Sequence, residues 1–170
     1  WMEEHFYNYI TVAAMLILYG VLFLVIEGRR KAPHVTRLEQ ITYRDALIIG
    51  LWQCLAIIPG TSRSGATIVG GLLLGLSRAC VAEFTFYLAI PVMAGASLLK
   101  VVKFVAGGSV MTGTEVVVLV VGCVVAFAVS MAAIRFLMDY VKRHDFKFFG
   151  LYRIVLGIIV LAVAAVTAIF

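Results

Sequence analysis

The chain has 170 residues, of which 64% are hydrophobic and 14% are charged. A soluble domain has roughly 45–50% apolar and about 25% charged residues, and a soluble fold of this size could not shield so many apolar side chains from water. The composition excludes a soluble enzyme, a disordered chain and a disulfide-rich secreted module, and it predicts an integral membrane protein. The net charge of +5 does not indicate nucleic-acid binding, because the basic residues lie in short loops between apolar segments.

Four apolar stretches are long enough to cross a bilayer as helices, which takes about 20 residues each. They are residues 9–26, 84–105, 116–138 and 149–170. A fifth apolar stretch, residues 46–76, is interrupted at residues 59–65 by the sequence PGTSRSG. A proline, two glycines, three hydroxyl side chains and an arginine cannot continue a helix that faces lipid.

Two loops rich in lysine and arginine set the predicted topology. Residues 28–44 hold five basic residues and residues 139–147 hold three, whereas residues 107–115 hold none. The positive-inside rule places the two basic loops in the cytoplasm and the third loop outside. The two spans before and after residues 107–115 lead out and back, so the interrupted stretch must make an even number of crossings. Its 31 residues are too few for two full spans and a turn, which need about 40, so we expect a re-entrant hairpin.

The expected fold class is therefore all-α: a polytopic membrane protein with four transmembrane helices and one re-entrant helix-turn-helix hairpin. We expect residues 1–170 to form a single transmembrane domain with the hairpin tip, residues 59–65, at membrane depth. Irregular backbone is stable there only where protein surrounds it or where it lines a wet cavity. Gly70, Gly71 and Gly75 on the second half of the hairpin would permit the close helix packing that this burial needs.

Arg63 is the residue of the tip that most needs an explanation. An arginine near the bilayer centre costs about 2.5–3.5 kcal/mol or more, and the acidic residues lie in loops or near the ends of spans. A guanidinium beside three hydroxyl side chains suits phosphate, because its planar fork binds two oxygens at once. If the second half-helix begins near Ser62–Ser64, its free N–H groups and dipole also point into the tip. These features predict an anion or phosphate site.

The predicted phosphate ligands are Gly60, Thr61, Ser62, Arg63, Ser64, Gly65 and Thr67, with Gln53 as a supporting polar residue. The two glycines would let the backbone approach a ligand. Several of these residues also have simpler explanations. Ser62 or Ser64 alone is most often a helix N-cap, and Thr67 can bond to its own helix.

Arg63 and several other charged residues also have structural interpretations that involve no ligand. Arg63 could pair with an acid elsewhere in the protein, and Glu83 is expected to pair with Arg78 near the interface. Arg135 and Arg153 lie near span ends, where long basic side chains reach for the interface or bind lipid head groups.

The run from Gly50 to Thr67, GLWQCLAIIPGTSRSGAT, closely resembles the second signature of the bacterial undecaprenyl-diphosphate phosphatases of the bacitracin-resistance type. The following GGLLLGLSR and two shorter matches extend the resemblance over most of residues 46–105. It implies hydrolysis of the C55 lipid diphosphate to its monophosphate, which recycles the carrier for peptidoglycan synthesis. It further implies an inverted-repeat fold whose two re-entrant tips meet, a divalent cation (Mg²⁺ or Ca²⁺), and a site open to the outer face of the bacterial plasma membrane.

The resemblance assigns catalytic roles to Arg63, as a diphosphate clamp, and to Ser62 and Ser64. The family's first repeat carries an E-x-x-x-E segment and an S-S-T-G-H-like tip, and neither occurs in these 170 residues, where Gln53 replaces a glutamate. The chain therefore resembles the C-terminal portion, which carries the second repeat and no metal ligands. We expect this segment alone to be inactive. Its expected partners, besides the lipid and the membrane, are the N-terminal repeat of the same protein and a second copy in a homodimer.

Two other functions fit the same residues. A lipid carrier or anion transporter would also place an anion against broken half-helices at the midplane. A structural membrane subunit would instead pair Arg63 with an acid of a partner.

Overall fold

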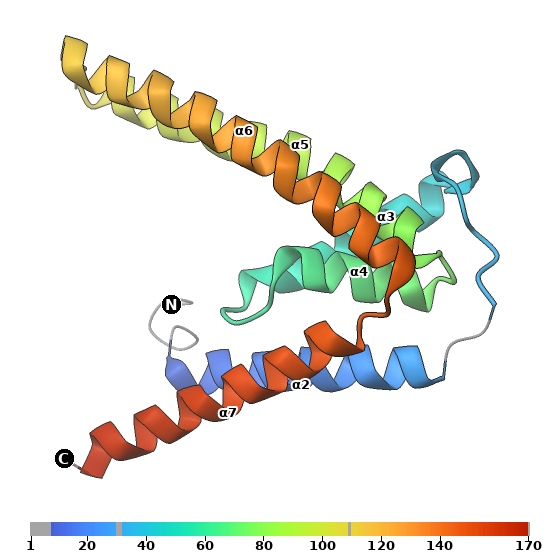
Figure 1. The fold of residues 1–170 in the computed structure, drawn as a ribbon. Coiled ribbons are helices and arrows are strands. Elements are labelled where there is room, and N and C mark those ends of the chain that lie inside the picture. The colour runs from blue at the N-terminus through green and yellow to red at the C-terminus, as the bar shows by residue number, and fades with distance from the viewer. Residues whose placement is uncertain (1–7, 30–31, 109, 170) are drawn as a thin grey trace.

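The structure is a computed structural model, and it describes residues 8–29, 32–108 and 110–169 of the chain. Its regular elements in these ranges are helices (Figure 1). Four of them are long and apolar enough to cross a membrane: α2 (Tyr9–Gly28), α5 (Arg78–Ala106), α6 (Gly113–Arg143) and α7 (Lys147–Ile169). The prediction of an all-α polytopic membrane protein is confirmed. Arg30 and Lys31 of the first basic loop, and Phe170 of the last predicted span, lie outside the described residues.

The helices extend past the apolar stretches because polar caps set where they begin. α5 begins at Arg78, six residues before the apolar stretch, and the Ser77 hydroxyl accepts a hydrogen bond from the Cys80 N–H at 3.2 Å. α6 begins after Thr112, which forms a capping box with Glu115. Hydropathy marks the residues that lipid can cover, whereas caps mark where helical hydrogen bonding starts.

A helical hairpin occupies the interrupted stretch. α3 (Tyr43–Cys54) leads through the short 3₁₀ turn η2 (Leu55–Ile57) into a loop, and α4 (Arg63–Leu73) returns. At 1.5 Å per residue the 12 residues of α3 and the 11 of α4 are about 18 and 17 Å long, roughly half of a bilayer core of about 30 Å. The two outer ends of the hairpin lie at the same end of the molecule as the two basic loops (Figure 1).

Polar contacts hold the basic-loop end together. The short η1 turn (Leu38–Gln40) leads into α3. The part of the basic loop that precedes η1 forms backbone hydrogen bonds with the turn that follows α4. The His34 N–H donates to the Gly75 carbonyl at 3.1 Å, and the Ser77 N–H donates to the Val35 carbonyl at 2.7 Å. These bonds fix the base of the α3–α4 hairpin to the basic loop.

The buried carboxylate of Glu27 joins three long helices at this end. It forms a two-pronged ion pair with Arg78 at the start of α5, with Nε 2.9 Å from Oε1, and accepts from the N–H of Phe146 just before α7 at 3.4 Å. The expected pairing of Glu83 with Arg78 is wrong. Five residues along an α-helix turn the side chain by about 140°, so the two lie on different faces of α5.

Glycines allow the hairpin to pack closely. A Cβ at Gly70 would lie 2.6 Å from the Trp52 ring of α3, and one at Gly71 would collide with Val81 of α5. Gly75 does not lie on the second half-helix as expected, because α4 ends at Leu73. It lies in the turn beyond, with a φ of +80° that favours glycine. Gly70 and Gly71 therefore serve packing, whereas Gly75 serves the turn.

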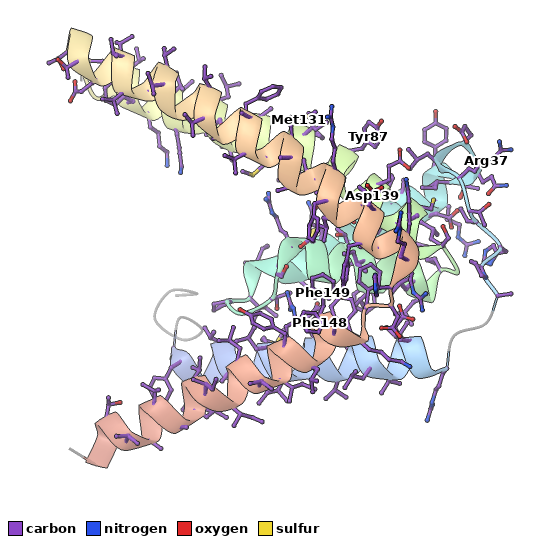
Figure 2. All side chains as sticks on the ribbon, viewed as in Figure 1. Arg37, Tyr87, Met131, Asp139, Phe148 and Phe149 are labelled. Carbon is purple, nitrogen blue, oxygen red and sulfur yellow. The ribbon has the colours of Figure 1, made fainter. Side chains whose placement is uncertain are left out.

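The long helices form two separate pairs. α2 and α7 lie side by side, and Gly20 and Gly150 pack so closely that a Cβ at Gly20 would lie 2.7 Å from the Gly150 carbonyl oxygen. The α5–α6 hairpin extends away from the α2–α7 pair, and side chains along its far half point outward from it (Figure 2). The α3–α4 hairpin lies between the two pairs, and its tip lies on the side where the pairs diverge (Figure 1).

Candidate functional site

The tip of the hairpin is an open helix N-terminus. α4 begins at Arg63, within the predicted range, and Ser62 is its N-cap, with an extended backbone and an Oγ that accepts from the Gly65 N–H at 3.1 Å. The N–H groups of the first helical turn have no carbonyl four residues earlier in the helix to bond. They point out of the end of α4, where the helix dipole is positive.

The first turn also presents a cation and two hydroxyls. The Arg63 side chain is exposed in this chain, and its Nη2 donates to the thioether of Met93 on α5 at 3.1 Å. Thioether sulfur is a weak acceptor, so the guanidinium keeps most of its donor capacity. The Oγ atoms of Ser62 and Ser64 lie 3.0 Å apart. Together these groups offer a cation and several hydrogen-bond donors at one point.

The loop before α4 is fixed against α2. Gly60 has a φ of +89°, and a Cβ there would lie 2.5 Å from the Val12 carbonyl oxygen, so both conformation and space require glycine. Thr61 is only 8% exposed, and its Oγ1 is buried with no hydrogen-bond partner among the described residues. The rigid loop thus holds an unpaired hydroxyl directly before the N-cap.

Thr67 and Gln53 lie behind the tip rather than at its surface. Thr67 is fully buried, and its Oγ1 lies 3.0 Å from the Ser64 carbonyl oxygen and 3.1 Å from the Thr85 Oγ1 of α5. It ties the first turn of α4 to α5 and so positions Ser64. Gln53 is half-buried in the last turn of α3.

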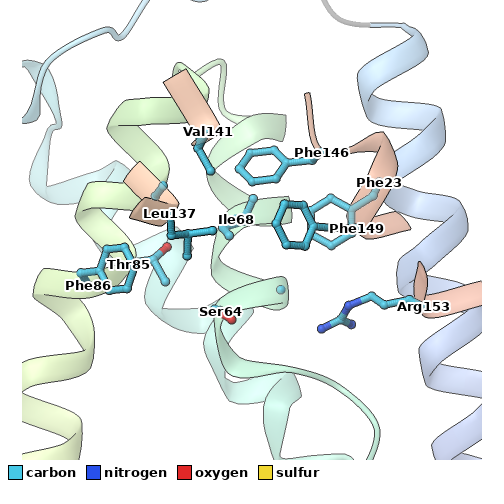
Figure 3. A pocket seen from close by; sticks show the side chains of 12 residues that line it. Phe23, Ser64, Ile68, Thr85, Phe86, Leu137, Val141, Phe146, Phe149 and Arg153 are labelled. Carbon is cyan, nitrogen blue, oxygen red and sulfur yellow. The ribbon is translucent and has the colours of Figure 1, made fainter. Parts of the chain in front are cut away.

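Arg153 on α7 is a residue of this site that the sequence interpretation missed. We expected its side chain to reach for the membrane interface. Instead it extends from α7 toward the first turn of α4 (Figure 3). A Cβ at Gly65 would lie 3.1 Å from its Nη2. It borders a cavity of about 170 Å³ that Ser64 and Gly65 also line, together with apolar side chains of α2, α4, α5, α6 and α7.

A helical pattern in the sequence could have found this arginine. Gly150 and Gly157 are the positions where α7 packs on α2, and Arg153 lies three residues after the first and four before the second. Residues with these spacings share one helix face. An arginine between two packing glycines therefore faces protein rather than lipid.

The residues of the tip suit an anion and do not suit a divalent cation. Mg²⁺ and Ca²⁺ take carboxylate, carbonyl and water oxygens, whereas the tip supplies guanidinium and amide donors beside its hydroxyls. Within the described residues, no group of three or more histidine, cysteine, aspartate or glutamate side chains could hold a metal.

The sequence of residues 1–159 matches the family model described as bacitracin resistance protein BacA. The chain belongs to this family. The run of Gly50–Thr67, which carries the resemblance in the sequence, forms the end of α3, the tip and the start of α4, so it coincides with the predicted anion site.

The similarity to curated relatives extends over nearly the whole chain. It is 56% identical over 163 residues to an undecaprenyl-diphosphatase of Streptococcus mutans, 57% over 167 residues to one of Lactococcus lactis, and 58% over 161 residues to one of Acetivibrio thermocellus. These matches cover 94–96% of this chain. The chain spans only 58–59% of the length of these relatives.

Proposed function

We propose that this chain supplies the phosphate-binding tip of a membrane phosphatase that hydrolyses undecaprenyl diphosphate to undecaprenyl phosphate and inorganic phosphate. Family membership and the names of the relatives support the reaction. The observation that carries the proposal is the N-terminus of α4, where Arg63, two serine hydroxyls and free amides converge. The product lipid would return to the carrier pool for peptidoglycan synthesis.

The tip binds the phosphate group and stabilises its charge. Arg63 takes two phosphate oxygens through its guanidinium fork, and the amides of the first turn bind a third oxygen. Ser62 and Ser64 donate hydroxyl hydrogen bonds, Gly60 and Gly65 keep the approach open, and Thr61 completes the ring of donors. Thr67 and Gln53 support this arrangement from behind. Such donors stabilise a transferring phosphoryl group most strongly in a site from which water is excluded.

The orientation of the hairpin supports a site open to the outer face of the plasma membrane. Both ends of the hairpin lie with the basic loops, which the positive-inside rule places in the cytoplasm, and the tip points away from them (Figure 1). A re-entrant hairpin of half-length helices would bring the tip to about the middle of the bilayer, where a lipid head group can reach it from outside.

The reaction also needs acidic groups, and we propose that a part of the whole protein outside this tip supplies them. The described residues place no carboxylate or histidine in contact with the tip. We propose that the divalent cation, Mg²⁺ or Ca²⁺, and the activating acids are held by the other repeat of an inverted-repeat fold. The 170 residues by themselves are then inactive. We also propose that the whole protein forms a homodimer.

The Arg63→Ala variant of the full-length protein tests the clamp. Loss of this contact should lower phosphate release from a polyprenyl diphosphate about a hundredfold, because one preorganised donor to the transition state is worth about 3 kcal/mol. Phosphate release is measured in detergent micelles, with Arg135→Ala as the matched control, since Arg135 lies exposed on α6. Equal turnover in the two variants would refute the role of Arg63.

The absence of a base at the described tip favours one second candidate, a lipid carrier or anion transporter that only binds phosphate. It predicts transfer of a polyprenyl phosphate across vesicle membranes with no phosphate released. Release of phosphate by the purified full-length protein, with no translocation, would exclude it.

A further inference from the structure

The surroundings of Arg153 are unusual for a structural arginine. Its guanidinium lies against Gly65, where a Cβ would be 3.1 Å from Nη2 and 3.3 Å from Cζ. Because Gly65 has no side chain, the guanidinium can lie against the backbone of the first turn of α4. A second cation therefore lies against the same helical turn that begins with Arg63.

This is an unfavourable place for a cation unless an anion is present. The N-terminus of α4 carries the positive end of the helix dipole, and burying a charged group costs free energy unless the charge is paired. The ion pairs among the described residues join Arg78 to Glu27 and Lys147 to Asp145, and neither includes Arg153. The Phe23 ring lies 6.0 Å from its Cζ, which gives only weak compensation. A negatively charged ligand would remove the repulsion.

Two buried polar groups near the first turn also lack partners. The Nη1 of Arg153 is buried and has no hydrogen-bond partner among the described residues, and the same holds for the Oγ1 of Thr61. Thr61 is 8% exposed and directly precedes the N-cap. Buried donors without partners are uncommon in folded proteins. A ligand with several oxygen atoms would satisfy both groups.

The two arginines approach the first turn of α4 from different helices. Arg63 contacts Met93 of α5, whereas Arg153 comes from α7 and borders the cavity of about 170 Å³. Apart from Arg153, Ser64 and Thr85, the side chains around this cavity are apolar (Figure 3). A ligand that fits both sides has two anionic groups, of which the one beside Arg153 carries the apolar chain.

We propose that Arg153 binds the lipid-linked phosphate of the polyprenyl diphosphate, while Arg63 binds the terminal phosphate. This inference rests on the proposed phosphatase function. In the hydrolysis, the oxygen of water bonds to the terminal phosphorus, and the anhydride P–O bond breaks with its electron pair on the bridging oxygen of the lipid phosphate. Arg153 binds the lipid phosphate before and while this bond breaks, so its loss is expected in KM, and the protons of water pass to the inorganic phosphate and to solvent.

The test compares Arg153→Gln, Arg153→Lys and the control Arg135→Gln in the full-length protein, with farnesyl diphosphate in detergent as the probe. Loss of a charged hydrogen bond should raise the KM of Arg153→Gln about 10- to 100-fold, with a smaller rise for Arg153→Lys, which keeps the charge but not the fork. The control should stay within twofold of the natural protein.

A binding measurement separates this inference from the proposed function. Farnesyl monophosphate should raise the melting temperature of the natural protein and of Arg63→Ala, because a ligand of the folded state stabilises it. The rise should be lost in Arg153→Gln. If the natural protein releases no phosphate, the proposed function fails, whereas this shift still reports on Arg153.

The Gly65→Ala variant keeps the arginine but crowds it, and it serves if Arg153→Gln does not fold. Alanine favours the helix, while its Cβ would displace the guanidinium. We expect a several-fold rise in KM without a lower melting temperature. Gly122→Ala is the control, because a Cβ there meets nothing within 4 Å. A KM within twofold of the natural protein in folded Arg153→Gln, or failing that in Gly65→Ala, would overturn the inference.

Discussion

Ser62 has two roles that can be separated by substitution. Its Oγ caps α4 by accepting from the Gly65 N–H, and it also lies 3.0 Å from the Ser64 Oγ at the proposed phosphate position. An N-cap needs an acceptor, whereas a phosphate ligand must not be negatively charged. The same atom therefore meets a structural and a functional requirement, which explains why either interpretation fits the sequence.

We predict that Ser62→Ala lowers both stability and phosphate release in the full-length protein, with a loss of about 1 kcal/mol in stability from the missing cap. Ser62→Asp should keep the cap and the melting temperature while its charge repels phosphate, so that phosphate release falls further than in Ser62→Ala. Thermal unfolding and phosphate release are measured on both variants. Equal activity of the two would show that Ser62 only caps the helix.

At the scale of elements, the α3–α4 hairpin follows from the number of membrane crossings that the basic loops allow and from the number of residues in the interrupted stretch. The hairpin turns at residues 58–62, at the start of the predicted break, because Pro59 and Gly60 interrupt helical hydrogen bonding. Residues 63–65, which were also expected to be part of the break, form the first turn of α4. The helix bounds are less apparent from hydropathy, since α5 begins at the Ser77 cap within a polar stretch. Gly75 was assigned to the wrong element because its spacing from Gly71 suits a helix, whereas its φ of +80° does not.

Cysteine labelling tests whether the hairpin is re-entrant. Single cysteines replace Tyr43 and Leu73 at its two outer ends, which are 97% and 56% exposed, and Val110 between α5 and α6, which is 87% exposed. The natural cysteines Cys54, Cys80 and Cys123 are first replaced by alanine. In oriented vesicles, a membrane-impermeant thiol reagent should label the first two from the same side as His144→Cys in the second basic loop, and Val110→Cys from the other side.

Labelling of Leu73→Cys and Tyr43→Cys from opposite sides would show that the segment crosses the bilayer, and the proposed topology would then be wrong. The reason for the expected result is length, since each helix of the hairpin covers only about half of the bilayer core.

At the scale of the whole molecule, the Glu27–Arg78 ion pair joins the two pairs of long helices. Glu27 belongs to α2 and Arg78 to α5, and the carboxylate also binds the chain just before α7. The Glu27 side chain is fully buried, whereas that of Arg78 is 34% exposed. The contact fixes the basic-loop end of the molecule, at the opposite end of the hairpin from the proposed phosphate site.

We predict that Arg78→Ala destabilises the protein by about 3 kcal/mol, because it leaves a buried carboxylate without its counter-charge. Glu27→Ala should cost less, because the partly exposed guanidinium can turn toward water. The double variant should cost less than the sum of the two, as expected for residues in contact. Unfolding in mild detergent is measured for all three. A larger loss in Glu27→Ala than in Arg78→Ala would contradict this order.

The sequence by itself determined that the protein lies in a membrane, that four long helices are present, and where along the chain the hairpin turns. Apolar content, span length and the composition of residues 59–65 act locally along the chain, so they need no tertiary contact to be interpreted. The charges near Ser62–Ser64 indicated an anion site for the same reason, since helix N-terminus and arginine are neighbours in sequence.

Only the tertiary structure decided which distant residues meet. Arg78 pairs with Glu27, 51 positions earlier, rather than with nearby Glu83, and Arg153 reaches Gly65 from a helix 88 positions further along the chain. Such pairings depend on which helix faces pack together, and small side chains such as Gly65 and Gly150 decide how closely they approach. The long-range charges of this protein were therefore set by packing, not by their local sequence.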